Sequence, residues 1–327
     1  MHFFEPVETT AFTLRPAAAS EKVGSIAKDC GFEPDAVAVG PEGEAVWGAL
    51  GFEGSAVADV RFWVAPERRG KRLASAMLRA AAPNVLAAGV RRLEVRPPVR
   101  DHAAIRSALR AGFRPDGGIS RGAAWDGTEA LVLGFVPGDG AGPTPRVLPD
   151  LPGGMLSDET VWLRPLAPED FEAHLRHRST PDVYAGAALP LPPSAAEAQE
   201  FCEWRAAVDW LRGRSALMVI DDGTGYQGTI GLYDVARVVG TGMIGYDLRK
   251  AVRGRGYATR AVNLMRRWAF HEVGLDRVWA GTDVHNAASQ AVLRRAGFQF
   301  EGVERGGLPT LGGPRRDTLL WAALSSD

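Results

Sequence analysis

The sequence of 327 residues lacks the features that mark several classes of protein. Its two cysteines, Cys30 and Cys202, lie far apart and in no C-x-x-C pair, which excludes a disulfide framework and favours a reducing, cytoplasmic environment. No uninterrupted run of about 18 apolar residues occurs, so neither a membrane-spanning helix nor a membrane partner is expected. The first thirty residues mix acidic with apolar groups and lack the basic start and apolar core of a signal peptide.

An excess of charge of either sign is also missing. Lysine and arginine together number 38 and aspartate and glutamate 39, which leaves a formal net charge of -1. Without a positive field over the whole molecule, no nucleic-acid partner is expected. The composition, 46% hydrophobic and 24% charged, is that of a globular protein, and at roughly 100 to 200 residues per domain the length predicts two domains.

The stretch from Pro137 to Gly154 separates the two halves of the sequence. Five prolines and five glycines in its eighteen positions disfavour helix and sheet alike. We therefore expect a linker at residues 137–157 between a first domain, 1–136, and a second domain, 158–327.

Both halves carry the same signals in the same order, which predicts an internal duplication. Each opens with Leu-Arg-Pro, at residues 14–16 and 163–165, and each later has an Arg-Gly turn before an Ala-rich helix. The turn glycines, Gly70 and Gly254, are 184 residues apart, and the Ala-Gly-Phe sequences that close the next helix are 185 residues apart. Chance similarity would rarely keep this register.

In the second half, the pattern predicts a strand, a glycine turn, a helix, a second strand and a second helix. The strands are expected at 243–248 and 277–282. Asn286 can cap the second helix and Gly297 can end it. This order implies a mixed α/β sheet, in which a ligand sits where a strand ends and a helix begins. The first helix is indicated by apolar residues at helical spacing, namely Ala258, Ala261, Val262, Met265, Trp268 and Ala269.

The glycine turn has the form R-x-x-G-x-A, from Arg253 to Ala258. Gly254 and Gly256 would let backbone N–H groups approach phosphates, and the N-terminus of the following helix adds positive partial charge. The turn is therefore a candidate pyrophosphate cradle. The alternative is a glycine-rich turn that only starts a helix.

The whole second half, from residues 161–170 through MIGYDLRKAVRGRGYATRAV to DVHNAASQAVLRRAGFQFEG, closely resembles the GNAT acetyltransferases. Within that family it is most similar to the branch that contains the ribosomal-protein N-terminal acetyltransferases. The resemblance implies two tandem GNAT-like α/β domains, each a mixed, mostly antiparallel twisted sheet flanked by helices. It also implies acetyl-CoA as co-substrate and no metal.

The resemblance further implies roles for single residues. The strand 243–248, which includes Leu248, would splay from its neighbour and offer backbone groups to the pantetheine arm and the thioester oxygen. Asn286 would contact pantetheine, with a plain helix cap as the alternative. The pyrophosphate would rest on the turn residues Arg253, Gly254, Arg255, Gly256, Tyr257 and Ala258.

Two positions depart from the family pattern. Leu293 stands where many members have the tyrosine that acts as acid for the leaving thiol, so Ser289 or water would have to substitute, although Ser289 could merely complete a helical turn. Asp247 stands where this branch commonly has an aromatic residue. It could receive the amine proton, bind a cationic acceptor, or be a solvated strand aspartate; Glu203 and Asp234 are further candidate carboxylates.

The first half resembles a decayed copy of the second. Arg72 takes the place of Gly256, where a side chain would crowd the approach of pyrophosphate to the backbone. Asp101 replaces Asn286, and Ala104 stands opposite the serine of the second half. We expect this half to keep the fold but to bind CoA weakly or not at all, in a monomer whose two domains pack like the subunits of a dimer.

The sequence therefore predicts that the second half is an N-acetyltransferase in which a primary amine attacks acetyl-CoA directly. The amine could belong to a small molecule or to a protein N-terminus, and the alternative is a non-catalytic acyl-CoA-binding or scaffold protein. His174 and His177, three residues apart on a predicted helix, could share a metal, but no third ligand is evident and none is expected. His285 could contact substrate or be an ordinary loop histidine.

Overall fold

The computed structural model describes residues 6–41, 43, 45–140, 142–185 and 191–327. The chain divides into two compact parts, unit 1 (residues 1–145) and unit 2 (residues 146–327). Among the described residues, no helix is both long enough and apolar enough to cross a membrane.

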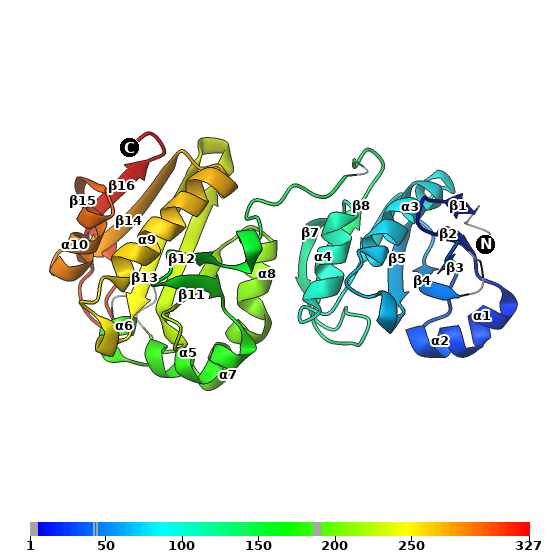
Figure 1. Cartoon of the computed structure of the whole chain (residues 1–327), viewed down its shortest axis with the longest axis horizontal. Helices are drawn as coiled ribbons and strands as arrows, with labels where there is room; N and C mark the ends of the chain where they lie inside the picture. Colours follow the sequence, from blue (N-terminus) through cyan, green and yellow to red (C-terminus); the bar gives the residue numbers. More distant parts are fainter. Residues whose placement is uncertain (1–5, 42, 44, 141, 186–190) are drawn as a thin grey trace. The chain divides into compact units, whose positions relative to one another are not determined.

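Each unit holds an eight-stranded sheet, and corresponding strands follow the same order in both (Figure 1). The order is β1-β2-β3-β4-β5-β6-β8-β7 in unit 1 and β9-β10-β11-β12-β13-β14-β16-β15 in unit 2. Among the described residues, neighbouring strands are antiparallel except for β5–β6 and β13–β14, which are parallel. The prediction of two tandem, mostly antiparallel α/β sheets is confirmed.

The strands of unit 1 are β1 (Val7–Glu8), β2 (Thr13–Pro16), β3 (Ala36–Val39), β4 (Val46–Glu53), β5 (Val57–Val64), β6 (Arg92–Val95), β7 (Arg114–Ser120) and β8 (Ala130–Phe135). Its α-helices are α1 (Ala19–Val23), α2 (Ser25–Cys30), α3 (Leu73–Ala87) and α4 (His102–Arg110).

The strands of unit 2 are β9 (Leu156–Ser157), β10 (Trp162–Pro165), β11 (Ala216–Asp221), β12 (Tyr226–Ala236), β13 (Thr241–Leu248), β14 (Arg277–Asp283), β15 (Gln299–Leu308) and β16 (Arg316–Leu324). Its α-helices are α5 (Phe171–Arg178), α6 (Pro181–Tyr184), α7 (Ala195–Glu200), α8 (Ala206–Leu211), α9 (Tyr257–Trp268) and α10 (Ala287–Arg295). A π-helical turn, Phe201–Arg205, joins α7 to α8, and a 3-10 turn, Lys250–Val252, follows β13.

Part of the segment predicted as a linker packs against unit 2. The boundary between the units falls after Pro145, inside the predicted segment 137–157. Leu148 and Leu151 are buried in the core of unit 2, and the Trp210 indole N–H donates to the Pro149 carbonyl at 2.9 Å. Apolar residues among the prolines therefore bind this part of the segment to unit 2.

The arginines of the two Leu-Arg-Pro sequences make matching ion pairs. Arg164 donates two hydrogen bonds of 2.8 Å to the carboxylate of Asp170, six residues later. Arg15 does the same with Glu21, at 2.8 and 2.9 Å. This shared fork ties the second strand of each sheet to the start of the following helical segment and supports the duplication.

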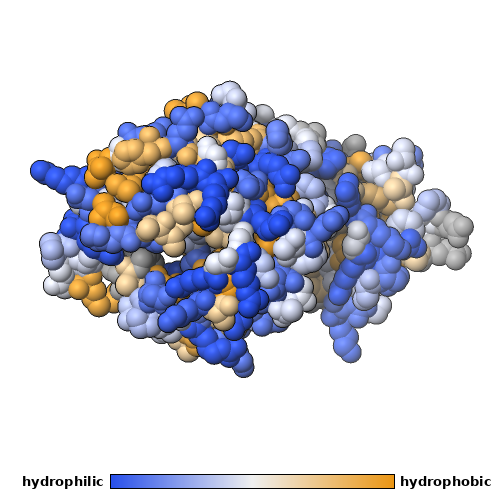
Figure 2. All heavy atoms as spheres, turned by 60° about the vertical axis from the view of Figure 1, so that its left-hand side comes forward, coloured by the Kyte–Doolittle hydropathy of each residue, from blue (hydrophilic) through white to orange (hydrophobic). Residues whose placement is uncertain are grey.

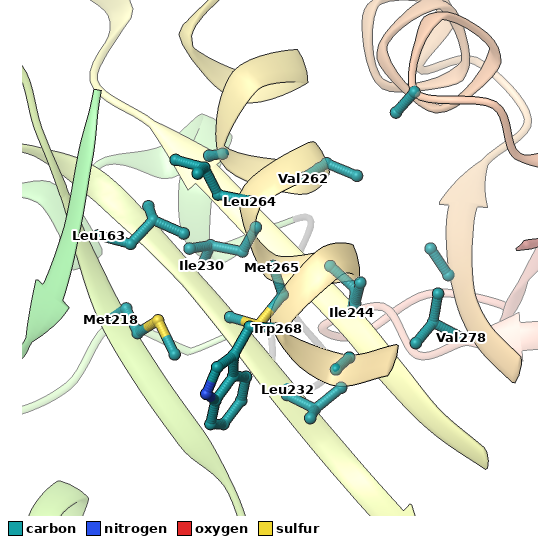
Figure 3. Close-up of a cluster of buried hydrophobic side chains, with 14 of the residues drawn as sticks. Leu163, Met218, Ile230, Leu232, Ile244, Val262, Leu264, Met265, Trp268 and Val278 are labelled. Carbon is teal, nitrogen blue, oxygen red and sulfur yellow. The ribbon is translucent and has the colours of Figure 1, made fainter. Parts of the chain in front are cut away.

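Helical elements cover both faces of the unit 2 sheet. Met218 of β11 belongs to a core cluster that includes Met265 and Trp268 of α9. The next residue, Val219, belongs to a second cluster that includes Cys202 of the π-helical turn. Successive strand residues face opposite sides, so α9 lies over one face and the α7–α8 segment over the other. Figure 3 shows side chains of α9 packed against those of the strands.

Candidate functional site

The strands β13 and β14 separate after a short stretch of pairing. They pair in parallel only along 241–243 of β13 and 277–279 of β14. From Ile244 onward, β13 keeps β12 on one side and, within the described residues, has no strand partner on the other. The predicted splay is confirmed, and it leaves backbone polar groups along one edge of β13 without a strand partner, although the Leu248 carbonyl accepts a hydrogen bond from Arg253.

The turn after β13 presents bare backbone at the start of α9. Gly254 and Gly256 have φ angles of 80° and 83°, in the left-handed region that favours glycine. No atom lies within 4 Å of the position that a Cβ would occupy on either glycine. Gly256 directly precedes Tyr257, the first residue of α9. Backbone N–H groups and the positive end of the helix dipole thus meet in open space, an arrangement that suits a diphosphate.

The side chains of Arg253 and Tyr257 bond to neighbouring parts of unit 2 and stabilise the turn. The Arg253 guanidinium donates to the Leu248 carbonyl at 3.0 Å and forms an ion pair with Asp182 of α6. The Tyr257 hydroxyl donates to Asp222 at 3.2 Å. Two predicted turn residues remain. Arg255 is exposed, whereas Ala258 is buried in the first turn of α9.

The start of α10 is built around Asn286 and Ser289. The Asn286 side-chain oxygen accepts a hydrogen bond of 3.0 Å from the Ser289 backbone N–H, so the cap interpretation is confirmed. Its amide N–H₂ group remains available to a ligand. The Ser289 hydroxyl lies 2.7 Å from the hydroxyl of Tyr246 on β13, which also donates to the Ser289 carbonyl at 3.2 Å. This bridge joins β13 to α10, the helix that follows β14.

Leu293 has no exposed surface and belongs to the core of unit 2. The missing family tyrosine is therefore replaced by a packing residue. Burial raises the pKa of Tyr246 to about 12, and the hydrogen bond with Ser289 opposes that rise. At neutral pH, Tyr246 is accordingly a neutral hydrogen-bond donor.

Asp247 faces away from Tyr246, toward α5. Its Oδ1 accepts hydrogen bonds from His177 Nε2 at 2.7 Å and from the backbone N–H and hydroxyl of Thr229 at 3.2 and 2.9 Å. Its Oδ2 accepts from Arg178 at 3.2 Å. Burial disfavours ionisation of Asp247, but the bond from His177, the positive charge of Arg178 and the bond from Thr229 together hold its pKa below the usual value.

Sequence reasoning missed His177, Arg178 and Thr229 as partners of Asp247. The metal hypothesis for His174 and His177 gains no third ligand, since no group of metal ligands occurs among the described residues. His174 instead lies 3.2 Å from the Tyr226 hydroxyl and stacks on Phe201.

The other candidate residues lie on the loop before α10, on the π-helical turn and on β12. His285 is exposed, and its backbone N–H donates to Asp283 at 2.7 Å. Glu203 lies on the π-helical turn, and Asp234 is exposed on β12.

The matching positions of unit 1 are filled. Arg72 directly precedes α3 and has a φ of 61°, so it keeps the left-handed turn but adds a side chain to it. Strands β5 and β6 also pair along three residues, 57–59 with 92–94. Phe62, which matches Tyr246, contacts Trp125 edge to face with ring centroids 5.1 Å apart. Asp101 caps α4 through a bond of 2.9 Å from the Ala104 N–H.

Comparisons with known proteins agree on one family. The family model "Acetyltransferase (GNAT) domain" matches residues 160–299. "Probable N-acetyltransferase YjcK" of Bacillus subtilis (strain 168) is 44% identical over 79 residues, which are 24% of this chain and 44% of that protein. The chain thus spans less than half the length of this relative.

Two further matches cover more of the relative. "Putative ribosomal N-acetyltransferase YdaF", also of Bacillus subtilis, is 33% identical over 123 residues, which are 36% of this chain and 67% of that protein. The solved structure "Mycobacterium smegmatis RimJ in complex with CoA-disulfide" is 25% identical, with a TM-score of 0.48, and covers 53% of this chain and 87% of that one. On the sequence matches, together with the glycine turn and the splayed strands, the chain belongs to the GNAT acetyltransferase family.

Proposed function

We propose that unit 2 transfers the acetyl group of acetyl-CoA to a primary amine by direct attack. The observation that carries this proposal is the pair of bare, left-handed glycines at the start of α9, beside the open edge of β13. A phosphate cradle next to unpaired strand backbone fits a ligand that has a diphosphate at one end and an acyl thioester at the other.

The residues divide into those that hold the donor and those that act on it. Backbone N–H groups at 254–258 hold the pyrophosphate, and the side-chain amide of Asn286 is free to bind the pantetheine arm. Acetyl-CoA supplies an activated acyl group on a thiol leaving group. The Ser289 hydroxyl, supported by Tyr246, stabilises the sulfur as negative charge develops on it.

The acceptor is an amine of a small molecule or of a protein N-terminus. A lysine-like amine with a pKa of about 10.4 is neutral in roughly one molecule per 2,500 at pH 7, a free-energy cost of about 4.6 kcal/mol. A peptide α-amine with a pKa of about 7.7 to 8.0 costs only about 1 to 1.4 kcal/mol. A basic amine therefore needs a proton acceptor in the site more than an α-amine does.

Unit 1 has a structural role in this proposal. Its turn carries Arg72, and Phe62, at the position of Tyr246, packs against Trp125. One CoA per chain in calorimetry would support this division of roles, and two would contradict it.

Release of free thiol from acetyl-CoA, measured against a panel of primary amines, tests the enzymatic activity. Amine-dependent release by the whole chain is expected. Tight CoA binding without release for any amine would contradict the proposal and favour the non-catalytic acyl-CoA-binding alternative, to which the buried Leu293 points.

A further inference from the structure

A histidine on α5 lies between the Asp247 carboxylate and a cavity. His177 lines a cavity of about 340 Å³ together with Ala173, Arg176, Thr180, Val183, Arg249, Lys250, Ala251 and Arg253. These residues come from α5, from α6 and the residue before it, and from the turn that leads from β13 to the glycine cradle. The cavity therefore adjoins both the end of β13 and the cradle, where an acceptor would approach the thioester.

The hydrogen bond to Asp247 determines which nitrogen of His177 can accept a proton. An ionised carboxylate only accepts hydrogen bonds, so Nε2 carries the hydrogen in the contact of 2.7 Å. In the neutral imidazole, the lone pair then lies on Nδ1. Among the described residues, Nδ1 has no hydrogen-bond partner, and it is not one of the fully buried polar atoms that lack one. The side chain of His177 is only 2% exposed, and the cavity lies beside its ring, so an acceptor would reach Nδ1 through the cavity.

Asp247 is better placed to orient His177 than to act as the base itself. Three of the bonds to its carboxylate come from His177 and Thr229, and Arg178 binds the other oxygen. A carboxylate stabilised in this way has little tendency to take up a proton. A carboxylate that fixes the tautomer and direction of an imidazole is the arrangement by which a histidine becomes a general base.

We propose that His177, oriented by Asp247, is the general base that receives a proton from the acceptor amine, a role that rests on the proposed acetyl transfer. The ammonium form of the acceptor gives one proton to His177 Nδ1. The neutral nitrogen then forms the C–N bond as the C–S bond breaks, the departing sulfur takes up the second proton lost by the nitrogen, and His177 returns its proton to solvent.

Several charged or titratable groups surround the imidazole and enter its pH dependence. The contributors are Asp247 on β13, Tyr226 on β12, His174 and Arg178 on α5, and Arg176, Arg249, Lys250 and Arg253 around the cavity. Asp182 of α6 adds a second carboxylate through its ion pair with Arg253, but Asp247 is the carboxylate bonded to the imidazole, so its removal is the substitution that most directly changes the orientation of His177.

His177→Gln tests the base through a pH profile. With the side-chain amine of Nα-acetyl-lysine amide, whose pKa is about 10.4, wild-type kcat/KM should level off well below pH 10. In His177→Gln it should fall by about 100- to 10,000-fold at pH 7 and rise with unit slope up to about pH 10, because only the free amine can then react. With the α-amine of a short peptide amide, the loss at pH 7 should be much smaller.

His174→Gln is the matched control. His174 lies three residues earlier on α5 and is buried, but it neither contacts Asp247 nor lines the cavity. Burial lowers the pKa of His174 to about 4, so its ring is uncharged at neutral pH, and His174→Gln should keep the wild-type shape of the pH profile. Equal losses in His177→Gln for both amines at every pH would indicate a structural role and overturn the inference.

Nitrogen-15 NMR of the histidine rings provides a readout that does not depend on turnover. Two-bond proton–nitrogen spectra, with His177 assigned by its loss in His177→Gln, should show the neutral ring protonated at Nε2 in the wild type and a shifted tautomer population in Asp247→Asn. A neutral ring protonated at Nδ1 in the wild type would overturn the inference. If the wild type acetylates no amine at all, the proposed function fails, and the role of His177 fails with it.

Discussion

Arg72 and Gly256 hold the same left-handed backbone conformation at the same point of two duplicated folds. Each residue directly precedes the helix that follows the turn, and their φ angles are 61° and 83°. Glycine adopts this conformation without steric cost, whereas an arginine pays about 1 to 2 kcal/mol for it. Unit 1 therefore keeps the left-handed backbone of the turn, although a side chain now covers the backbone that glycine leaves exposed in unit 2.

The first prediction concerns Gly256→Arg. No atom lies near the position of its Cβ, so the new side chain would occupy the space left for the diphosphate. Loss of a charged hydrogen bond of about 2 to 3 kcal/mol should weaken CoA binding by roughly 30- to 150-fold in calorimetry.

Gly274→Arg is the matched control for this substitution. Gly274 has a φ of 77° and an equally open Cβ position, but it ends a different helical segment. Gly274→Arg should lower the free energy of unfolding by a similar amount to Gly256→Arg and leave the affinity for CoA unchanged. An unchanged dissociation constant for CoA in Gly256→Arg would contradict the proposal that the pyrophosphate binds at this turn.

The second prediction is that Arg72→Gly stabilises unit 1 without restoring a CoA site. The substitution removes the free-energy cost of holding arginine in the left-handed conformation. This should outweigh the greater conformational entropy that glycine gives the unfolded chain, so the free energy of unfolding of unit 1 should rise by about 0.5 to 1 kcal/mol. The unit 1 transition in urea would report this gain. Calorimetric stoichiometry should stay at one CoA per chain, because the Phe62–Trp125 contact and the Asp101 cap at the position of Asn286 both remain. A second bound CoA would show that Arg72 alone had closed the site.

The glycine turn could be predicted because it depends on local signals, whereas the duplication was indicated by motifs that recur in the same order and the splay was implied by the resemblance to the GNAT acetyltransferases. Left-handed glycines, a capping asparagine and apolar spacing each act within a few residues. The contact between His177 and Asp247 joins residues 70 positions apart, and nothing in either local pattern pairs them. The Tyr246–Ser289 bridge, over 43 positions, was missed for the same reason. The burial of Leu148 and Leu151 inside the predicted linker could not be foreseen, because it depends on tertiary packing and not on the local proline content.

The third prediction tests the hydroxyl pair of Ser289 and Tyr246, which we propose stabilises the leaving sulfur. Ser289→Ala keeps the cap of α10, since Asn286 binds the backbone N–H of residue 289 and not its hydroxyl. Loss of a hydrogen bond to a charged atom, about 1.5 to 3 kcal/mol, should lower kcat by roughly 10- to 150-fold with little change in CoA affinity.

Tyr246→Phe should lower kcat by less, about 2- to 12-fold, because Tyr246 acts through Ser289. In the double variant, the Tyr246 substitution should then add little to the loss caused by Ser289→Ala. A full, additive loss in the double variant would mean that Tyr246 contacts the reacting groups independently of Ser289.

The fourth prediction concerns the pH dependence of stability at His174. Burial, with a further contribution from the charge of Arg178, lowers the pKa of His174 to about 4. The unfolded chain binds a proton at an ordinary histidine pKa of about 6.5, so stability is lost as pH falls from 6.5 toward 4. Between pH 7 and pH 4.5 the loss from this group is about 2 kcal/mol. In urea unfolding, His174→Gln should therefore show a smaller decrease over this range than the wild type. Substitution of the exposed His271 by Gln should keep the wild-type decrease, and an equal decrease in all three proteins would show that His174 takes up its proton while folded.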